Sequence, residues 1–198
     1  MARLLHHGGG NFGVVTEFEY QLHPFNRKLL SGGIVWPVAQ MRDVLEFYGE
    51  WAGGLSDEMY VGPTIMTMPD GTGVVAMDVV YNGDPAAGEK ELAPLRRIGT
   101  PMADGVIMQD YMVMQTQSDA AFGHGVRSYA KNGMVKEISQ ELVDAMIDAY
   151  IPDPRVFITN HVAGGAVKRV GELDTAFPHR NAEIMLVIVS GWMDPAQD

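Results

Sequence analysis

The stretch EMYVGPTIMTMPDGTGVVAMDVVY, residues 58–81, decides the fold of this chain. Its two halves are rich in β-branched and aromatic side chains, which predicts one strand over 58–68 and another over 74–81. Between them lies the sequence PDGTG, residues 69–73, whose composition is typical of a tight turn. Two strands joined by so short a turn must run antiparallel, so this stretch predicts a hairpin.

Further strands are predicted on both sides of the hairpin, at residues 12–24, 28–36, 155–162 and 183–192. Helices are predicted over 38–52, from Asp84 to about Arg97, and after Ser139. The less regular middle of the chain is expected to hold a short strand or buried turn at 111–115, and a loop with a short helix over 118–135. Because hairpins favour antiparallel pairing, we predict an α+β fold, a single domain whose antiparallel β-sheet has helices covering one face.

Composition excludes several classes of function. The chain has 198 residues and a net charge of −11, which disfavours binding to nucleic acid or to an anionic membrane. It has no cysteine, so disulfides, thiolate metal sites and cysteine nucleophiles are excluded. No segment reaches 18 consecutive apolar residues, and no apolar secretory leader begins the chain. We therefore expect a cytoplasmic protein with no membrane contact.

The glycines at the start of the chain have the spacing Gly8-x-Gly10-x-x-Gly13, the letter pattern of a dinucleotide-binding turn. That turn requires a buried strand before the glycines and a helix after them. Here only seven residues precede Gly8, and residues 14–22 are strand-like. A glycine-rich turn that leads into a strand is the better interpretation.

Three groups of residues together carry a family resemblance. They are GGGNFGVVT at 8–16 followed by FEYQLHP at 18–24, Tyr129-Ala130-Lys131, and Gly164-Gly165-Ala166-Val167 followed by Phe177-Pro178-His179-Arg180 and Trp192. In this order and spacing the chain resembles the FAD-linked oxidases of the berberine bridge enzyme-like group, within the vanillyl-alcohol oxidase superfamily. Members of that family are roughly twice as long, with an FAD-binding domain and a substrate-binding domain.

The resemblance implies that residues 25–198 form the substrate-binding domain and that residues 1–24 are a remnant of the FAD-binding domain with its junction strand. FAD is the implied cofactor, and main chain that lacks Cβ atoms can lie close against its ring. The residues implied to contact the flavin are Gly9, Gly10, Asn11, Phe12, Gly13, Val14 and Val15.

The candidate catalytic residues are His161, Tyr129 and Lys131. His161 stands where plant members of the family have a glutamate that acts as general base, and an imidazole can do the same work near neutral pH. Tyr129 and Lys131 fall in a segment that the family places near the active-site cavity. The competing interpretations are a solvated histidine at a strand end, a buried tyrosine and an exposed lysine. No histidine or acidic cluster has metal-ligand spacing, so no metal is expected.

These observations predict part of an FAD-dependent oxidoreductase that acts on a small alcohol, amine or sugar-like substrate and lacks turnover alone. The alternative is a non-catalytic small-molecule-binding or assembly domain. An uncovered sheet face would then form a homodimer or bind a separate flavin-binding chain.

Overall fold

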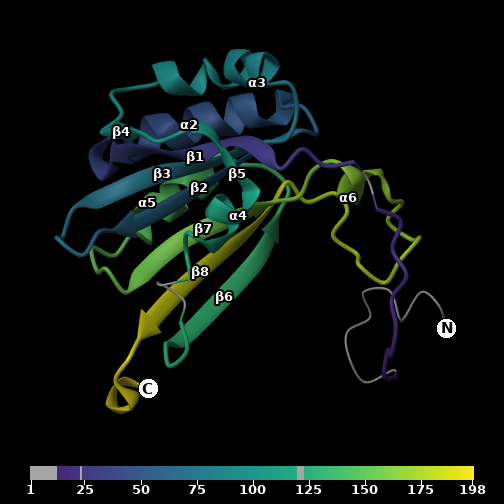
Figure 1. Ribbon diagram of the computed structural model, residues 1–198. Coiled ribbons are helices and arrows are strands. Elements are labelled where there is room, and N and C mark those ends of the chain that lie inside the picture. The colour runs from purple at the N-terminus through teal and green to yellow at the C-terminus, as the bar shows by residue number, and fades with distance from the viewer. Residues whose placement is uncertain (1–12, 23, 120–122) are drawn as a thin grey trace.

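The protein is described by a computed structural model that covers residues 13–22, 24–119 and 123–198 (Figure 1). Its strands form one eight-stranded sheet in the order β4-β1-β3-β2-β7-β8-β6, and β5 pairs with the outer edge of β1. The strands are β1 (Lys28–Pro37), β2 (Met59–Thr67), β3 (Gly73–Tyr81), β4 (Ala103–Asp104), β5 (Ile107–Asp110), β6 (Arg127–Val135), β7 (Val156–Val162) and β8 (Ile184–Trp192). Each pair of neighbouring strands in the described residues runs antiparallel, which confirms the predicted fold class.

The hairpin of β2 and β3 forms as its sequence predicts. Thr67 pairs with Gly73, and the register continues without interruption to Met59 opposite Tyr81. In the turn, the Met68 amide donates to the Thr72 carbonyl at 2.8 Å. The hairpin lies at the centre of the sheet, with β1 on one side and β7 on the other, so it sets the direction of the remaining strands.

The described helices are α2 (Met41–Trp51), α3 (Pro85–Leu92), α4 (Tyr111–Thr116), α5 (Gln140–Asp148) and α6 (Ala166–Arg169). Short 3-10 turns also occur at η1 (Val38–Gln40), η2 (Ala52–Gly54), η3 (Leu95–Arg97) and η4 (Pro195–Gln197). The helix predicted from Asp84 is capped by the Asp84 carboxylate, which accepts from the Ala87 amide at 3.0 Å. It ends earlier than predicted, because Pro94 has no amide hydrogen to continue the helix, and η3 follows. None of the described helices has the length and apolar character needed to cross a bilayer.

The core lies between the sheet and α2, α3 and α5, and we call this side of the sheet the covered face (Figure 1). Trp36 and Met77 from the strands are fully buried there against Val44 and Tyr48 of α2. The helices do not reach the end of the sheet formed by β8 and β6, where Ile188 is 41% exposed on the same face. Apolar burial therefore stabilises mainly the half of the sheet made of β1, β3, β2 and β7.

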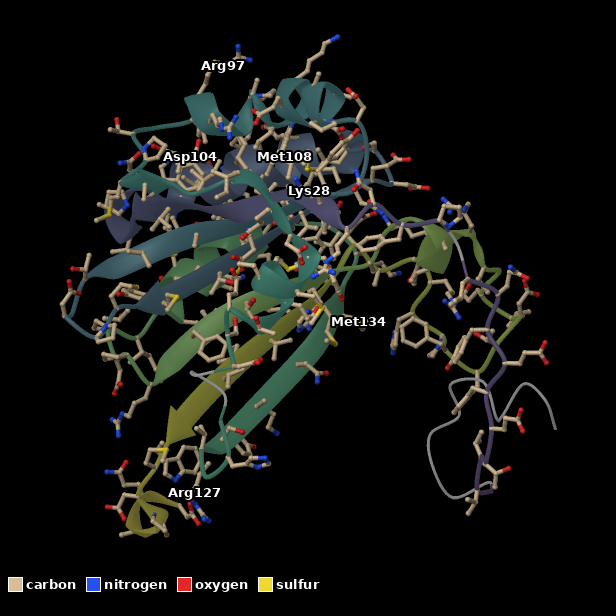
Figure 2. All side chains as sticks on the ribbon, in the orientation of Figure 1. Lys28, Arg97, Asp104, Met108, Arg127 and Met134 are labelled. Atoms are coloured by element: carbon tan, nitrogen blue, oxygen red, sulfur yellow. The ribbon has the colours of Figure 1, made fainter. Side chains whose placement is uncertain are left out.

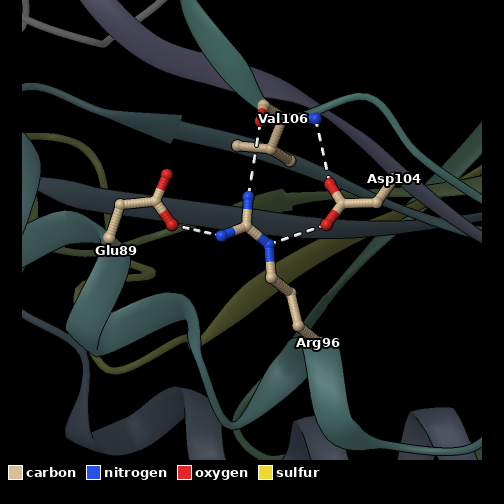
Figure 3. A network of polar contacts seen from close by, with 4 residues as sticks. All are labelled: Glu89, Arg96, Asp104 and Val106. Atoms are coloured by element: carbon tan, nitrogen blue, oxygen red, sulfur yellow. Dashed lines mark hydrogen bonds and ion pairs between the residues drawn. The ribbon is translucent and has the colours of Figure 1, made fainter.

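Arg96 ties the helical layer to the outer edge of the sheet (Figure 3). Its guanidinium forms ion pairs with Glu89 of α3 and with Asp104 of β4, the latter at 2.7 Å. The other Asp104 oxygen accepts from the Val106 amide at 3.1 Å. These contacts hold the segment that contains β4 and β5 along β1.

The strand predicted over 12–24 is wrong for the residues described there. Residues 13–22 and 24–26 have no regular secondary structure, and Figure 1 shows this segment running away from the sheet. The alternating Phe18, Tyr20 and Leu22 side chains are 68%, 72% and 81% exposed. An extended segment becomes a strand only when another strand completes its backbone hydrogen bonds, and no described strand pairs with this one.

Two predictions in the middle of the chain are also wrong. Residues 111–116 form the helix α4 instead of a strand or turn, because Asp110 caps them by accepting from the Met112 amide at 2.9 Å. The loop predicted over 118–135 contains β6, which pairs with β8 over its full length. Since β6 is exposed along most of both faces, its sequence shows no alternation of apolar and polar residues.

Candidate functional site

The candidate site lies on the face of the sheet opposite α2, α3 and α5, which we call the open face. Gly33 of β1 pairs with Asp78 of β3, and Asp78 pairs with Gly62 of β2. Residues paired directly across strands project to the same face of a sheet. Asp78 alternates with the buried Met77 and Val79, so it projects to the open face between two positions that have no side chain.

His161 of β7 continues this line. Thr64 pairs with Thr159, and extending the antiparallel register by two residues places His161 across from Gly62. The close approach of the Asn160 carbonyl, 3.2 Å from the position of a Cβ on Gly62, agrees with that placement. Beyond His161 the line passes to Met185 and then Met134, which is labelled in Figure 2. We call these six residues, from Gly33 to Met134, the central row.

Tyr60 brings a hydroxyl group over the middle of the central row. A Cβ placed on Gly62 would lie 2.5 Å from the Tyr60 hydroxyl oxygen, so the tyrosine side chain occupies the space that glycine leaves. The hydroxyl donates to the Asn160 carbonyl at 3.3 Å. Tyr60 therefore stands between Asp78 on one side and His161 on the other, which are two interstrand spacings, about 10 Å, apart.

The electrostatics of Asp78 and Tyr60 are coupled. Burial among the neighbouring strands raises the pKa of the Asp78 carboxyl, although the residue stays exposed to water across the open face. The Thr64 hydroxyl opposes that shift, and it is itself hydrogen-bonded to the Thr159 hydroxyl at 2.9 Å. The pKa of Tyr60 is raised by burial and further by the negative charge of Asp78. The open face thus holds an acid, a phenol and an imidazole in one polar region.

The structure does not bring the three predicted catalytic residues together. On β6, Tyr129 pairs with Ser190 and Lys131 pairs with Ile188. Ile188 in turn pairs with the buried Ile158, so Tyr129 and Lys131 project to the side of the sheet that carries the core, beyond the reach of the helices. They lie beside each other, with the Lys131 ammonium 5.8 Å from the centre of the Tyr129 ring. Only His161 projects to the open face.

Of the residues predicted to contact flavin, Gly9, Gly10, Asn11 and Phe12 lie outside the described part of the chain. Gly13, Val14 and Val15 are described and exposed, Val14 to 91%. No atom lies within 4 Å of a Cβ placed on Gly13.

Asp78, Tyr60 and Gly62 were not among the predicted site residues. One signal was present in the hairpin sequence, where Asp78 is the only charged residue within an otherwise apolar strand. Charged side chains are rarely buried without a partner, so a lone aspartate in such a strand indicates a position that faces away from the core. Convergence with His161 could not be read from that signal, because it depends on the pairing of β2 with β7.

The FPHR segment, residues 177–180, is held in place by its arginine. Arg180 is buried, donates to the Thr175 hydroxyl at 2.7 Å and to the Val167 carbonyl at 3.3 Å, and lies 4.9 Å from the centre of the Phe177 ring. It therefore organises the segment between β7 and β8. Within the described residues, no three histidine or acidic side chains are grouped closely enough to hold a metal ion.

Similar proteins are known from sequence. No protein-family model matches the chain. An FAD-linked oxidoreductase of Dictyostelium discoideum is 28% identical over 186 residues, which cover 92% of this chain and 40% of the relative. The (R)-6-hydroxynicotine oxidase of Paenarthrobacter nicotinovorans is 26% identical over 166 residues, covering 83% of this chain and 33% of the relative.

Solved structures share the fold at lower identity. The berberine bridge enzyme-like protein 1 of Physcomitrella patens matches with a TM-score of 0.72 and 14% identity, over 88% of this chain and 41% of that protein. The 6-hydroxy-D-nicotine oxidase of Arthrobacter nicotinovorans matches with a TM-score of 0.69 and 19% identity, over 89% and 40%. The chain is thus similar in sequence to FAD-linked oxidoreductases and shares the fold of the berberine bridge enzyme-like structures, and it spans a third to about two fifths of the length of these relatives.

Proposed function

We propose that this chain supplies the substrate side of an FAD-dependent oxidoreductase that oxidises a small alcohol, amine or sugar-like hydroxyl compound. Residues 25–198 would be its substrate-binding domain, and residues 1–24 its link to the flavin-binding part. The observation that carries the proposal is the central row, in which His161 and Asp78, with the Tyr60 hydroxyl beside them, lie on the face of the sheet opposite α2, α3 and α5. The relatedness to FAD-linked oxidoreductases supports the same reading.

His161 is the proposed general base. It is exposed on the open face, where its imidazole can accept the proton that a substrate hydroxyl or ammonium group loses on oxidation. FAD, when bound, supplies the acceptor for the hydride that leaves the substrate carbon. Tyr60, adjacent to His161, can orient the reacting group through its hydroxyl oxygen. Tyr129 and Lys131 remain predicted site residues, although they lie on the other side of the sheet.

We further propose that the chain has no turnover alone. All seven of its predicted flavin contacts fall within the short segment 9–15, and the described ones, Gly13, Val14 and Val15, are exposed. So few contacts offer little to offset the loss of freedom when a cofactor as large as FAD binds. The flavin would be held mainly by a second polypeptide segment.

The test is to purify the chain with FAD present, alone and mixed with the flavin-binding portion of the Dictyostelium relative. Flavin absorbance and the oxidation of alcohols, amines and sugars are then measured. We expect turnover only in the mixture, and a loss of about 10²- to 10⁴-fold in kcat for His161→Gln, as for removal of a general base. His179→Gln is the matched control, and Tyr129→Phe and Lys131→Gln test the other two predicted residues in the same assay.

A colourless protein that takes up no flavin in either sample, and that elutes as a stable homodimer, would contradict the proposal. It would favour the alternative, a non-catalytic small-molecule-binding or assembly domain. That alternative is favoured by one observation, the extent of uncovered surface on the open face and at β6.

A further inference from the structure

We propose that Asp78 is the anchor for a protonated amine on the open face, so that the site takes small molecules that carry an ammonium group. The inference deepens the proposed function and rests on it, because it names a substrate class for the same site. It assigns Asp78 to substrate binding and leaves proton transfer to His161. A ligand held at both residues would span about 10 Å, two interstrand spacings.

The first support is the absence of a counter-ion. Within the described chain, no lysine, arginine or histidine forms an ion pair with Asp78. Some other carboxylates have such a partner, as Asp104 has Arg96 and Asp153 has Arg155. A carboxylate crowded by neighbouring strands and without a cation is a strong acceptor for a positively charged donor.

The second support is steric. Side chains in neighbouring strands normally cover one another, but Asp78 has glycine on both sides in the central row. A Cβ placed on Gly33 would be 3.9 Å from the nearer Asp78 carboxylate oxygen, at ordinary contact distance. On the Gly62 side the Tyr60 hydroxyl fills the space, whereas Gly33 leaves the carboxylate accessible, and a larger residue at Gly33 would close that approach.

The third support is the arrangement of hydrogen-bond partners. An ammonium group has three donors and no acceptor, so it needs several acceptors in different directions. Asp78 offers carboxylate oxygens, and the nearby Tyr60 oxygen can accept while its own proton is donated to the Asn160 carbonyl. The Thr64 hydroxyl, which is hydrogen-bonded to the Thr159 hydroxyl, lies on the adjacent row and lowers the pKa of the carboxyl, in opposition to the larger effect of burial. The net charge of −11 adds a general attraction for cations.

The test measures binding of benzylamine, as its ammonium ion, and of benzyl alcohol to the full chain without flavin, by NMR titration near neutral pH. We expect benzylammonium to bind more tightly than the alcohol, because charge-assisted hydrogen bonds are stronger. Asp78→Asn should weaken benzylammonium binding by about tenfold or more and leave alcohol binding unchanged. Asp43→Asn, on α2 behind the sheet, makes the same change of net charge and should have less than about a twofold effect, as expected for an exposed distant charge.

Gly33→Val is a second variant that keeps the charge of Asp78 and obstructs the approach to it, so it should also weaken benzylammonium binding. Thermal unfolding of each variant verifies that it is folded. The proposal is overturned if benzylammonium binds no better than benzyl alcohol, or if Asp78→Asn and Asp43→Asn behave alike. Because no flavin is present, a negative result here leaves the oxidoreductase proposal intact. If benzylammonium binds through Asp78 but no flavin-dependent turnover is found, then the ammonium site is supported and the proposed oxidoreductase activity is contradicted.

Discussion

The two faces of the sheet use alternate residues of the same strands for opposite purposes. On the covered face, Ile34, Trp36 and Met77 are completely buried beneath the helices. On the open face, the adjacent positions of the same strands hold Gly33 and Asp78, and Asp78 is exposed to solvent. Since successive residues point to opposite faces, the fold can be stabilised by one set while the other set is left for binding. Mutations at two consecutive residues of β1 or β3 should therefore differ in their effect: one should lower the stability of the fold, and the other should alter binding.

Gly32 and Gly33 give the largest expected difference between the faces. Gly32 has φ +148°, and an added Cβ would lie 2.2 Å from the Gly105 carbonyl oxygen, which is backbone and cannot rotate away. We expect Gly32→Ala to lower the free energy of unfolding by about 3 kcal/mol, through overpacking and backbone strain. Urea unfolding followed by circular dichroism measures the change.

Gly33→Ala is the matched control for that prediction. Its Cβ would have only ordinary contacts, so a change near zero is expected, within about 0.5 kcal/mol. Equal losses in both variants would show that β1 is constrained similarly on its two faces, and the comparison would then fail.

The covered face was the part of the fold that the sequence predicted well. Apolar spacing in 38–52 and the hairpin over 58–81 depend on local chemistry, and both are confirmed. The strand predicted over 12–24 was wrong because alternation alone does not supply a pairing partner. β6 was missed because both of its faces are largely exposed.

The open face was predictable only in part. His161 was predicted from its position before Gly164-Gly165 and projects to the open face, whereas Tyr129 and Lys131, predicted near the active-site cavity, project to the other face. The face of the sheet to which a side chain projects depends on the register of its strand, and a shift of one residue moves it to the opposite face. Asp78 and Tyr60 meet His161 only through the pairing of three strands, which no local pattern specifies.

Two tyrosines sharpen the comparison at a smaller scale. On the covered side, the Tyr48 hydroxyl donates to the Val61 carbonyl at 2.7 Å and is buried. Tyr48→Phe should therefore cost about 1 kcal/mol of stability, the usual net value of such a hydrogen bond. Tyr60→Phe on the open face, whose bond to Asn160 is 3.3 Å and partly exposed, should cost less.

The pH dependence of unfolding tests the burial of Tyr48. Burial raises the pKa of Tyr48 above its ordinary value of 10.0, so the folded state retains the proton that the unfolded state loses. Stability from this group is complete below pH 10.0 and declines as pH rises further. The difference between wild type and Tyr48→Phe, followed by urea unfolding, should shrink in that alkaline range. A constant difference would mean that Tyr48 ionises as freely as in the unfolded chain.

The smallest expected effect is the contribution of two carboxylates, Asp78 and Asp70, to folding stability, and these contributions should have opposite signs. The pKa of Asp78 is raised by burial from 3.8, so the folded state prefers its protonated form and loses stability as pH rises through that raised pKa. The pKa of Asp70 in the hairpin turn is lowered from 3.8 by the Thr72 amide, so its contribution is present above pH 3.8 and is lost as pH falls through the lowered pKa.

Thermal unfolding at neutral and acid pH should therefore show opposite signs for two chemically identical substitutions. At neutral pH, Asp78→Asn should be at least as stable as wild type and Asp70→Asn less stable, and both differences should shrink in acid. If Asp78→Asn is instead less stable than wild type at neutral pH, then the Asp78 carboxylate stabilises the fold. The expected result would mean that the open face keeps an acid that folding does not favour, which is the behaviour of a group retained for binding.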